Sequence, residues 1–176
     1  MKIKDALDLI KPILSEEKYQ HTLRVAKLAK KLAKHYGVSK KKTLLAVYLH
    51  DVGYFYENKA KDKSLSHADL SVKFARDQGI DDPVILDAIR YHTVGHPAMD
   101  TIAKIVYMAD AAEMGRDYEG LDKIRKVLFE NLDGALLLHL QYNEDKLKRR
   151  GKGMHPDSIK LRKKLKDTKG ELFERT

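Results

Sequence analysis

The chain has 176 residues, a length typical of one domain with a core of its own. Hydrophobic residues make up 43% and charged residues 35%, a balance typical of globular proteins and not of disordered ones. Cysteine is absent, which excludes disulfides, thiolate metal sites, iron–sulfur clusters and cysteine nucleophiles. The net charge of +9 favours an anionic partner: a nucleotide, RNA or a membrane surface.

The hydrophobic periodicity predicts helices almost throughout the chain. Ser66 is the expected N-cap of one helix, and Asp82 followed by Pro83 is expected to begin the next. The apolar stretch over 41–56 suits a buried helix or a buried strand. The other expected helices cover 17–36, 67–78, 83–92, 100–113, 121–129, 132–150 and 156–166.

No segment shows the strict alternation of a half-buried strand, so we expect one all-α domain, a bundle of about eight helices over residues 1–166. Residues 167–176 are expected to form a polar, frayed tail. The apolar run 136–140 suits either the core or the surface of a homodimer. No membrane helix or signal peptide is expected, so the predicted location is the cytoplasm.

Several polar residues fall inside or at the edge of apolar helical segments, where an unpaired charge is costly. They are His21, His50, Asp51, His67, His92 and Asp110. Helix bundles build metal sites from inward-pointing residues of this kind. Without thiols, such a site uses imidazole and carboxylate ligands, which suit iron, manganese, zinc or magnesium.

This series of histidines and aspartates resembles the metal-binding pattern of the HD-domain phosphohydrolase superfamily in its two-metal form. The segments 88–97, 105–110 and 115–120 are similar to those of one branch, the bacterial YqeK-type symmetrical bis(5′-nucleosyl)-tetraphosphatases. The similarity extends from about His21 to Leu165.

The resemblance implies a buried di-iron centre. His21, His50, Asp51 and Asp110 are expected to hold one metal, and Asp51 is expected to bridge to a second metal held by His67 and His92. The implied activity is hydrolysis of diadenosine tetraphosphate into two ADP by a metal-activated water, with Asp51 as the central catalytic residue.

The phosphates of such a substrate need cations outside the metal site. The candidates are Arg24, Arg90, Lys104 and Arg116, of which Arg116 is favoured because Gly115 and Gly120 place it in a loop. His96 is a further candidate, either as a contact to phosphate or as the proton donor to the leaving ADP.

Two positions depart from the family pattern. Tyr54 stands where many relatives have a lysine that can meet substrate phosphate, and a phenol lacks that charge. A lysine of the following loop, Lys59, Lys61 or Lys63, is a possible replacement. Met114 stands where a proline is expected. Both departures bear on substrate preference more than on metal binding.

Three alternatives stay open at this point. The first is an HD phosphohydrolase acting on a nucleoside monophosphate or a cyclic dinucleotide. The second is a non-catalytic module that holds a structural metal and binds RNA or the ribosome through the lysine-rich faces at 27–42 and 146–166. The absence of interleaved aromatics favours solvated faces instead. The third is oxygen chemistry at a di-iron site.

Overall fold

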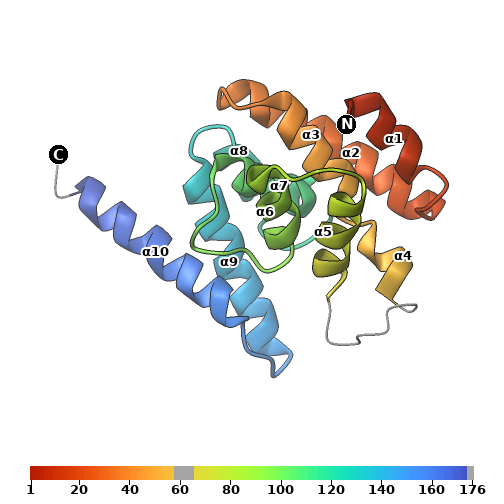
Figure 1. Cartoon of the computed structure of the whole chain (residues 1–176). Coiled ribbons are helices and arrows are strands. Elements are labelled where there is room, and N and C mark those ends of the chain that lie inside the picture. The colour runs from red at the N-terminus through yellow and green to blue at the C-terminus, as the bar shows by residue number, and fades with distance from the viewer. Residues whose placement is uncertain (58–65, 174–176) are drawn as a thin grey trace. The chain divides into compact units, whose positions relative to one another are not determined.

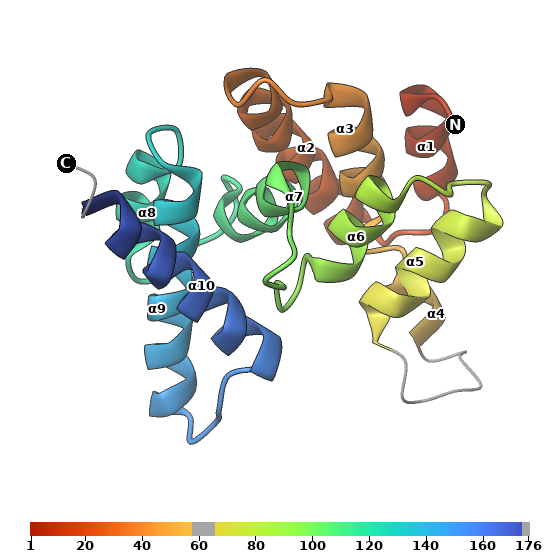
Figure 2. The same ribbon diagram turned by 60° about the vertical axis from the view of Figure 1, so that its left-hand side comes forward.

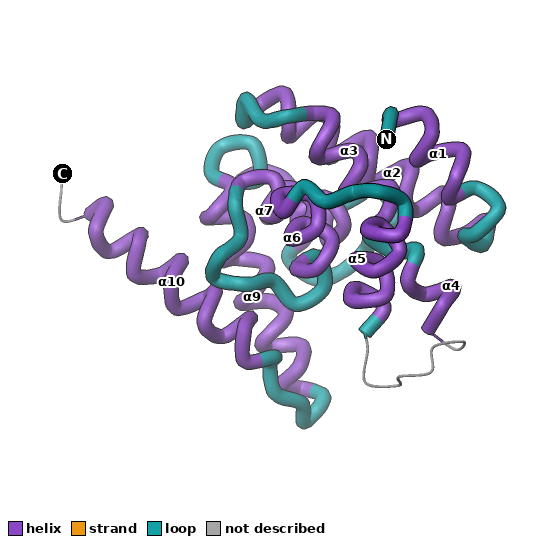
Figure 3. The backbone as a smooth tube through the Cα atoms, viewed as in Figure 1, coloured by secondary structure: helices purple, strands orange, loops and turns teal. Residues whose placement is uncertain are grey.

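The computed structural model describes residues 1–57 and 66–173, with side chains up to residue 168, and within them every regular element is an α-helix (Figure 3). The all-α prediction is therefore confirmed. The described residues form ten helices, where the periodicity predicts about eight. The prediction omits α1 (Ile3–Ile10), and the stretch 41–56 forms two helices instead of one. None of the described helices combines the length and the apolar character needed to span a bilayer.

The chain divides into two compact units. The first contains residues 1–93 and 99–116, and the second contains residues 94–98 and 117–176. The expected single domain over residues 1–166 stays a prediction.

Helix α3 (Lys40–Leu49) is the central helix of the first unit (Figures 1 and 2). It contacts five other helices: α1, α2 (Glu16–His35), α5 (His67–Asp77), α6 (Pro83–Tyr91) and α7 (Thr101–Ala112). Every residue from Thr43 to Leu49 is buried. A helix that is apolar on all sides belongs in such a position, which explains why this stretch shows no amphipathic period.

Side-chain caps fix where the helices of this unit begin. The hydroxyl of Ser66 accepts from the backbone N–H of Asp69, and Asp82 accepts from Val84 ahead of a helix that has Pro83 at its first position. Both predicted caps are confirmed. Each cap satisfies an N–H group that the helix itself leaves without a partner.

The stretch 41–56 is helical and not a strand, and the chain turns at His50 and Asp51 before α4 (Gly53–Glu57) begins. The hydroxyl of Ser71 on α5 donates to the carbonyl of His50 at 2.7 Å and accepts from the N–H of Gly53 at 2.8 Å. A Cβ at Gly53 would lie only 1.8 Å from the carbonyl oxygen of His67. The turn is thus held against the start of α5.

The second unit contains α8 (Leu121–Val127), α9 (Leu132–Arg149) and α10 (Pro156–Phe173), with α9 packed against both of the others. Leu136, Leu137 and Leu140 are buried, so the apolar run of α9 is core in the single chain. Helix α10 continues beyond Lys166, where the sequence predicts its end, because no proline interrupts the polar segment that follows. Residues 174–176 of the expected frayed tail lie outside the described residues.

Candidate metal centre

Five separate segments of the first unit bring the six predicted ligands together. His21 lies on α2, His50 and Asp51 lie in the turn after α3, and His67 begins α5. His92 directly follows α6, and Asp110 lies in α7. Except for Asp110, which is partly exposed, all of them are buried.

The ligand atoms form two overlapping groups. One group contains His21, His50 and Asp51, and the other contains Asp51, His67 and His92. Within each group, one nitrogen or carboxylate oxygen from every member lies within 4.8 Å of the others. Asp110 joins through His21, because its Oδ1 lies 2.9 Å from Nε2 of that ring. Asp51, which is expected to bridge two metals, belongs to both groups.

Hydrogen bonds at the rear of the rings orient three of the four imidazoles. Nδ1 of His50 donates to the carbonyl of Val47 at 2.6 Å, and Nδ1 of His92 donates to that of Ile89 at 2.7 Å. Because a carbonyl can only accept, the proton of each neutral ring is on Nδ1 and Nε2 keeps its lone pair. Nδ1 of His21 faces a carboxylate at 3.0 Å in the same way. Histidines that bind metals are held by such partners.

The Nε2 atoms of His50, His67 and His92 have too few hydrogen-bond donors around them, because the hydroxyl of Thr93 lies 3.1 Å from both His67 and His92 and can donate to only one of the two. Nε2 of His50 is buried and has no partner among the described residues. Nε2 of His67 lies 3.1 Å from Nε2 of His92, so two atoms of the same kind face each other. Burial lowers the pKa of His50, and burial together with His92 lowers the pKa of His67 to about 4, so both rings are neutral at pH 7. A cation that accepts these lone pairs would satisfy all of them, and the residues therefore fit a metal.

Both aspartates are ionised at neutral pH. Burial acts to raise the pKa of Asp51, but His50, His92 and Lys18 outweigh it and hold this pKa well below its usual range. For Asp110, the hydrogen bond from His21 and the nearby positive charges likewise outweigh burial and lower the pKa. Burial acts to lower the pKa of His21, but Asp110 and Glu113 outweigh burial and raise this pKa. Carboxylate oxygens and imidazole nitrogens together are the donor set that iron, manganese and zinc accept.

Lys18 is a member of the site that the sequence prediction missed. Its Nζ lies 2.9 Å from Oδ2 of Asp51 and 3.7 Å from the centroid of the Tyr54 ring. The Tyr54 ring in turn stacks on His67, with the ring centroids 3.9 Å apart. Lys18 precedes His21 by three residues, so both lie on one face of α2, which is the signal that could have found it. Lys59, Lys61 and Lys63 lie outside the described residues.

Glu113 is a second residue that the prediction missed. It directly follows α7, and its side chain is 2% exposed. Its carboxylate accepts from Nδ1 of His21 at 3.0 Å, from Nε of Arg24 at 2.7 Å and from the backbone N–H of Gly115. The carboxylate thereby fixes the ring of His21 from behind, and Arg24 holds the carboxylate in place.

The residues predicted to contact substrate differ in where they lie. The guanidinium of Arg116 contacts Asp110, with Nη2 2.6 Å from Oδ1 and Nε 3.0 Å from the backbone carbonyl oxygen. Arg90 is exposed near the end of α6 and precedes His92 by two residues, roughly 200° around the helix. Lys104 lies in the first half of α7, about 9 Å along the helix axis from Asp110. The cluster thus contacts Arg116 directly, and Arg24 through Glu113.

His96 lies in the second unit, where its Nδ1 accepts from the backbone N–H of Ala98 at 3.1 Å. The cluster of the first unit does not include it. Its expected role toward phosphate or the leaving group stays a prediction.

Comparisons with known proteins agree with this arrangement. The model of the HD domain family matches residues 19–115, a segment that contains all six predicted ligands. A protein named symmetrical bis(5′-nucleosyl)-tetraphosphatase from Halalkalibacterium halodurans is 33% identical, and the match covers 88% of this chain and 91% of that protein. A protein of the same name from Bacillus subtilis is 32% identical, with coverage of 90% and 95%.

The fold of this chain is also similar to that of a solved structure. The crystal structure of a predicted HD superfamily hydrolase involved in NAD metabolism, from Clostridium acetobutylicum, matches with a TM-score of 0.84. The match covers 96% of this chain and 98% of that one, at 29% sequence identity.

Proposed function

The chain belongs to the HD-domain family, and from this premise we propose that it is a metal-dependent hydrolase that cleaves diadenosine tetraphosphate symmetrically into two ADP. The observation that carries the proposal is the pair of overlapping histidine–aspartate groups that share Asp51. The names of the two relatives, each matched over most of its length, support the substrate.

We assign the six ligands to two metal ions. His21, His50, Asp51 and Asp110 would hold the first, and Asp51, His67 and His92 would hold the second. Iron is the proposed metal, and manganese, zinc and magnesium also accept this donor set. When bound, the ions supply an acidified water at neutral pH and neutralise charge on the phosphates.

The proposed reaction consumes one water for each substrate molecule. The water oxygen forms a bond to one of the two central phosphorus atoms, and the bond from that phosphorus to the oxygen between them breaks. The bridging oxygen leaves on one ADP and takes up a proton, while the hydroxyl group stays on the other ADP. His96 is proposed as the donor of that proton.

Two cations beside the cluster are proposed to hold the phosphates of the substrate. The side chain of Arg116 is 43% exposed and is anchored on Asp110, so its guanidinium is both fixed and accessible. The side chain of Lys18 is 38% exposed and is anchored on Asp51. Phosphate oxygens accept strong charge-assisted hydrogen bonds from such groups. Arg24 is proposed to position His21 through Glu113 and not to contact substrate.

The proposal is tested by initial rates on a small panel of nucleotides. The protein is loaded with iron in the absence of oxygen and offered diadenosine tetraphosphate, AMP and cyclic di-AMP at equal concentration. We expect diadenosine tetraphosphate to be turned over fastest and chelation to abolish turnover. Faster turnover of AMP or of the cyclic dinucleotide would contradict the proposed substrate.

A further inference from the structure

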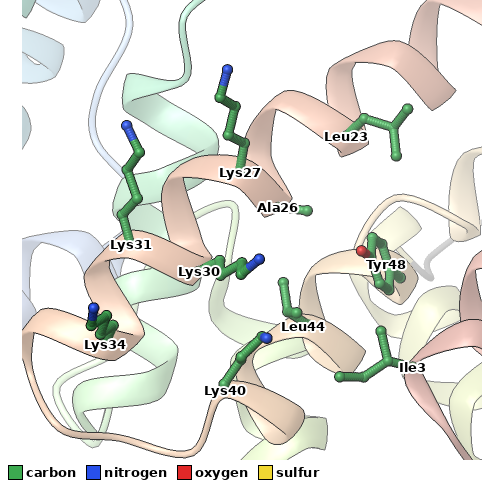
Figure 4. A pocket seen from close by; sticks show the side chains of 10 residues that line it. All are labelled: Ile3, Leu23, Ala26, Lys27, Lys30, Lys31, Lys34, Lys40, Leu44 and Tyr48. Carbon is green, nitrogen blue, oxygen red and sulfur yellow. The ribbon is translucent and has the colours of Figure 1, made fainter.

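Helices α2 and α3 line a groove of about 580 Å³ that contains none of the predicted metal ligands (Figure 4). Its lining residues come from α1, α2 and α3, which all belong to the first unit. They are of two kinds, lysines and apolar residues, and no aspartate or glutamate is among them. A mixed lining of this kind selects a ligand that is itself part anionic and part apolar.

The lysines form one cationic face of the groove. Lys27, Lys30, Lys31 and Lys34 follow one another at helical spacing on α2, and Lys40 begins α3. Among the residues that the structure describes, none of the five is ion-paired with a carboxylate. Lys42, by contrast, is paired with Asp82 at 2.8 Å. The groove therefore carries positive charge that the surrounding described residues do not neutralise.

Leu23, Tyr48 and Ile3 lie toward the other end of the groove, and Leu44 lies beside Lys30 and Lys40 (Figure 4). Leu23 precedes the lysines on α2, and Tyr48 follows Leu44 on α3, with Ile3 of α1 beside them (Figure 4). Tyr48 is 8% exposed, so it forms part of the floor and does not project. The twelve residues from Leu23 to Lys34 span about 16 Å of helix axis. Apart from Leu44, charge and apolar surface are thus separated along the length of the groove.

We propose that this groove is a second nucleotide site that binds a nucleoside polyphosphate. The base would lie against Tyr48 and Leu23, and the phosphates would lie among Lys30, Lys34 and Lys40. Such a ligand is apolar and planar at one end and polyanionic at the other, which matches the separation along the groove. The inference does not rest on the proposed hydrolase activity, because it uses none of the residues of the metal centre.

Two other polyanions match the groove less well. Single-stranded nucleic acid is held by several aromatic side chains in succession, and this groove contains one. A membrane surface is bound by apolar side chains that project beyond the basic ones. Here the arrangement is the reverse, because the lysines are exposed while Leu44 and Tyr48 are buried.

The test measures ATP binding by titration calorimetry in EDTA and low salt, so that no metal can recruit the polyphosphate. We expect saturable one-to-one binding to the unmodified protein. The variant with Lys30→Glu, Lys34→Glu and Lys40→Glu should bind ATP at least 10-fold more weakly. The control variant with Lys123→Glu, Lys146→Glu and Lys163→Glu has the same net charge, also changes exposed positions, and should bind like the parent protein. Thermal melting checks that both variants fold.

A second pair of measurements tests the apolar end. Tyr48→Leu keeps the floor apolar and should weaken ATP binding several-fold without changing the binding of inorganic tripolyphosphate. The proposal is overturned if ATP does not bind or if both triple variants behave alike. If tripolyphosphate binds as tightly as ATP, the base contributes nothing to binding. The groove would then be an unspecific anion site, which contradicts the proposal. A short single-stranded RNA that outcompetes ATP and loses affinity in the groove variant would assign the groove to RNA.

Discussion

Lys18 and Asp51 form an ion pair at the edge of the metal centre, with Nζ 2.9 Å from Oδ2. The same ammonium lies over the ring of Tyr54. The family resemblance predicts a lysine at position 54, and this chain has a tyrosine there. Lys18 of α2 supplies a positive charge beside the cluster instead. Its ammonium makes a cation–π contact with the ring of Tyr54.

The first prediction concerns the charge of Lys18. Lys18→Met keeps an unbranched apolar stem and removes the ammonium, so we expect the KM for diadenosine tetraphosphate to rise about 10-fold, the value of one charged hydrogen bond. Metal content should not change. Lys42→Met is a matched control, because Lys42 is 40% exposed and forms an ion pair of 2.8 Å with Asp82. An equal KM in both variants would show that Lys18 does not hold substrate.

The second prediction concerns Asp51. Asp51→Asn preserves the shape of the side chain but removes the charge that two metals would share, so we expect loss of metal binding and a fall in kcat/KM of at least about 1,000-fold. A bound metal stabilises the folded protein by mass action. EDTA should therefore lower the melting temperature of the parent protein and leave that of the variant unchanged. Full metal occupancy in Asp51→Asn would rule out a shared ligand.

The third prediction concerns Glu113, which contacts His21 from behind. Glu113→Gln removes the charge that orients the ring and pairs with Arg24, and we expect metal affinity to fall about 10- to 100-fold. Anaerobic titration with ferrous iron measures this directly. Glu119→Gln is the control, since Glu119 is exposed and pairs with Arg149. Affinity unchanged by Glu113→Gln would mean that His21 needs no support from this residue.

The fourth prediction concerns the close approach of Gly53 to α5. A Cβ here would collide with the backbone carbonyl of His67, and backbone cannot move aside as a side-chain tip can. We expect Gly53→Ala to destabilise the protein by about 2 kcal/mol or more and to displace His67. Gly153→Ala should be close to neutral, because nothing lies within 4 Å of the position that its Cβ would occupy. Denaturant unfolding of the two variants would contradict the account if it gave equal stabilities.

The sequence predicts the fold class and the members of the cluster because their signals are local. Helical spacing is visible in each segment, and the caps at Ser66 and Asp82 depend on residues within one turn. A histidine or aspartate inside an apolar segment is a weak signal by itself, and the whole series together with the family resemblance identifies the members of the cluster. Even α1 has a local signal, since Ile3, Ala6 and Ile10 repeat at helical spacing.

The remaining features depend on contacts between distant segments. The turn at His50 requires Ser71, which lies 21 residues away, and the absence of a side chain at Gly53. Lys18 and Glu113 look like ordinary charges on solvated helix faces until Asp51 and His21 are placed beside them. Helical spacing places Lys18 on the same face of α2 as His21, but it does not show that Asp51 lies beside Lys18 or that Glu113 lies beside His21.

The most direct test of the account is the identity of the products. Iron-loaded protein, prepared without oxygen, is incubated with diadenosine tetraphosphate, and the products are resolved by ion-exchange chromatography. The account predicts ADP as the sole product, formed in a ratio of two for each substrate consumed. AMP and ATP in equal amounts would contradict it, because they would place the cleavage at an outer phosphoanhydride bond.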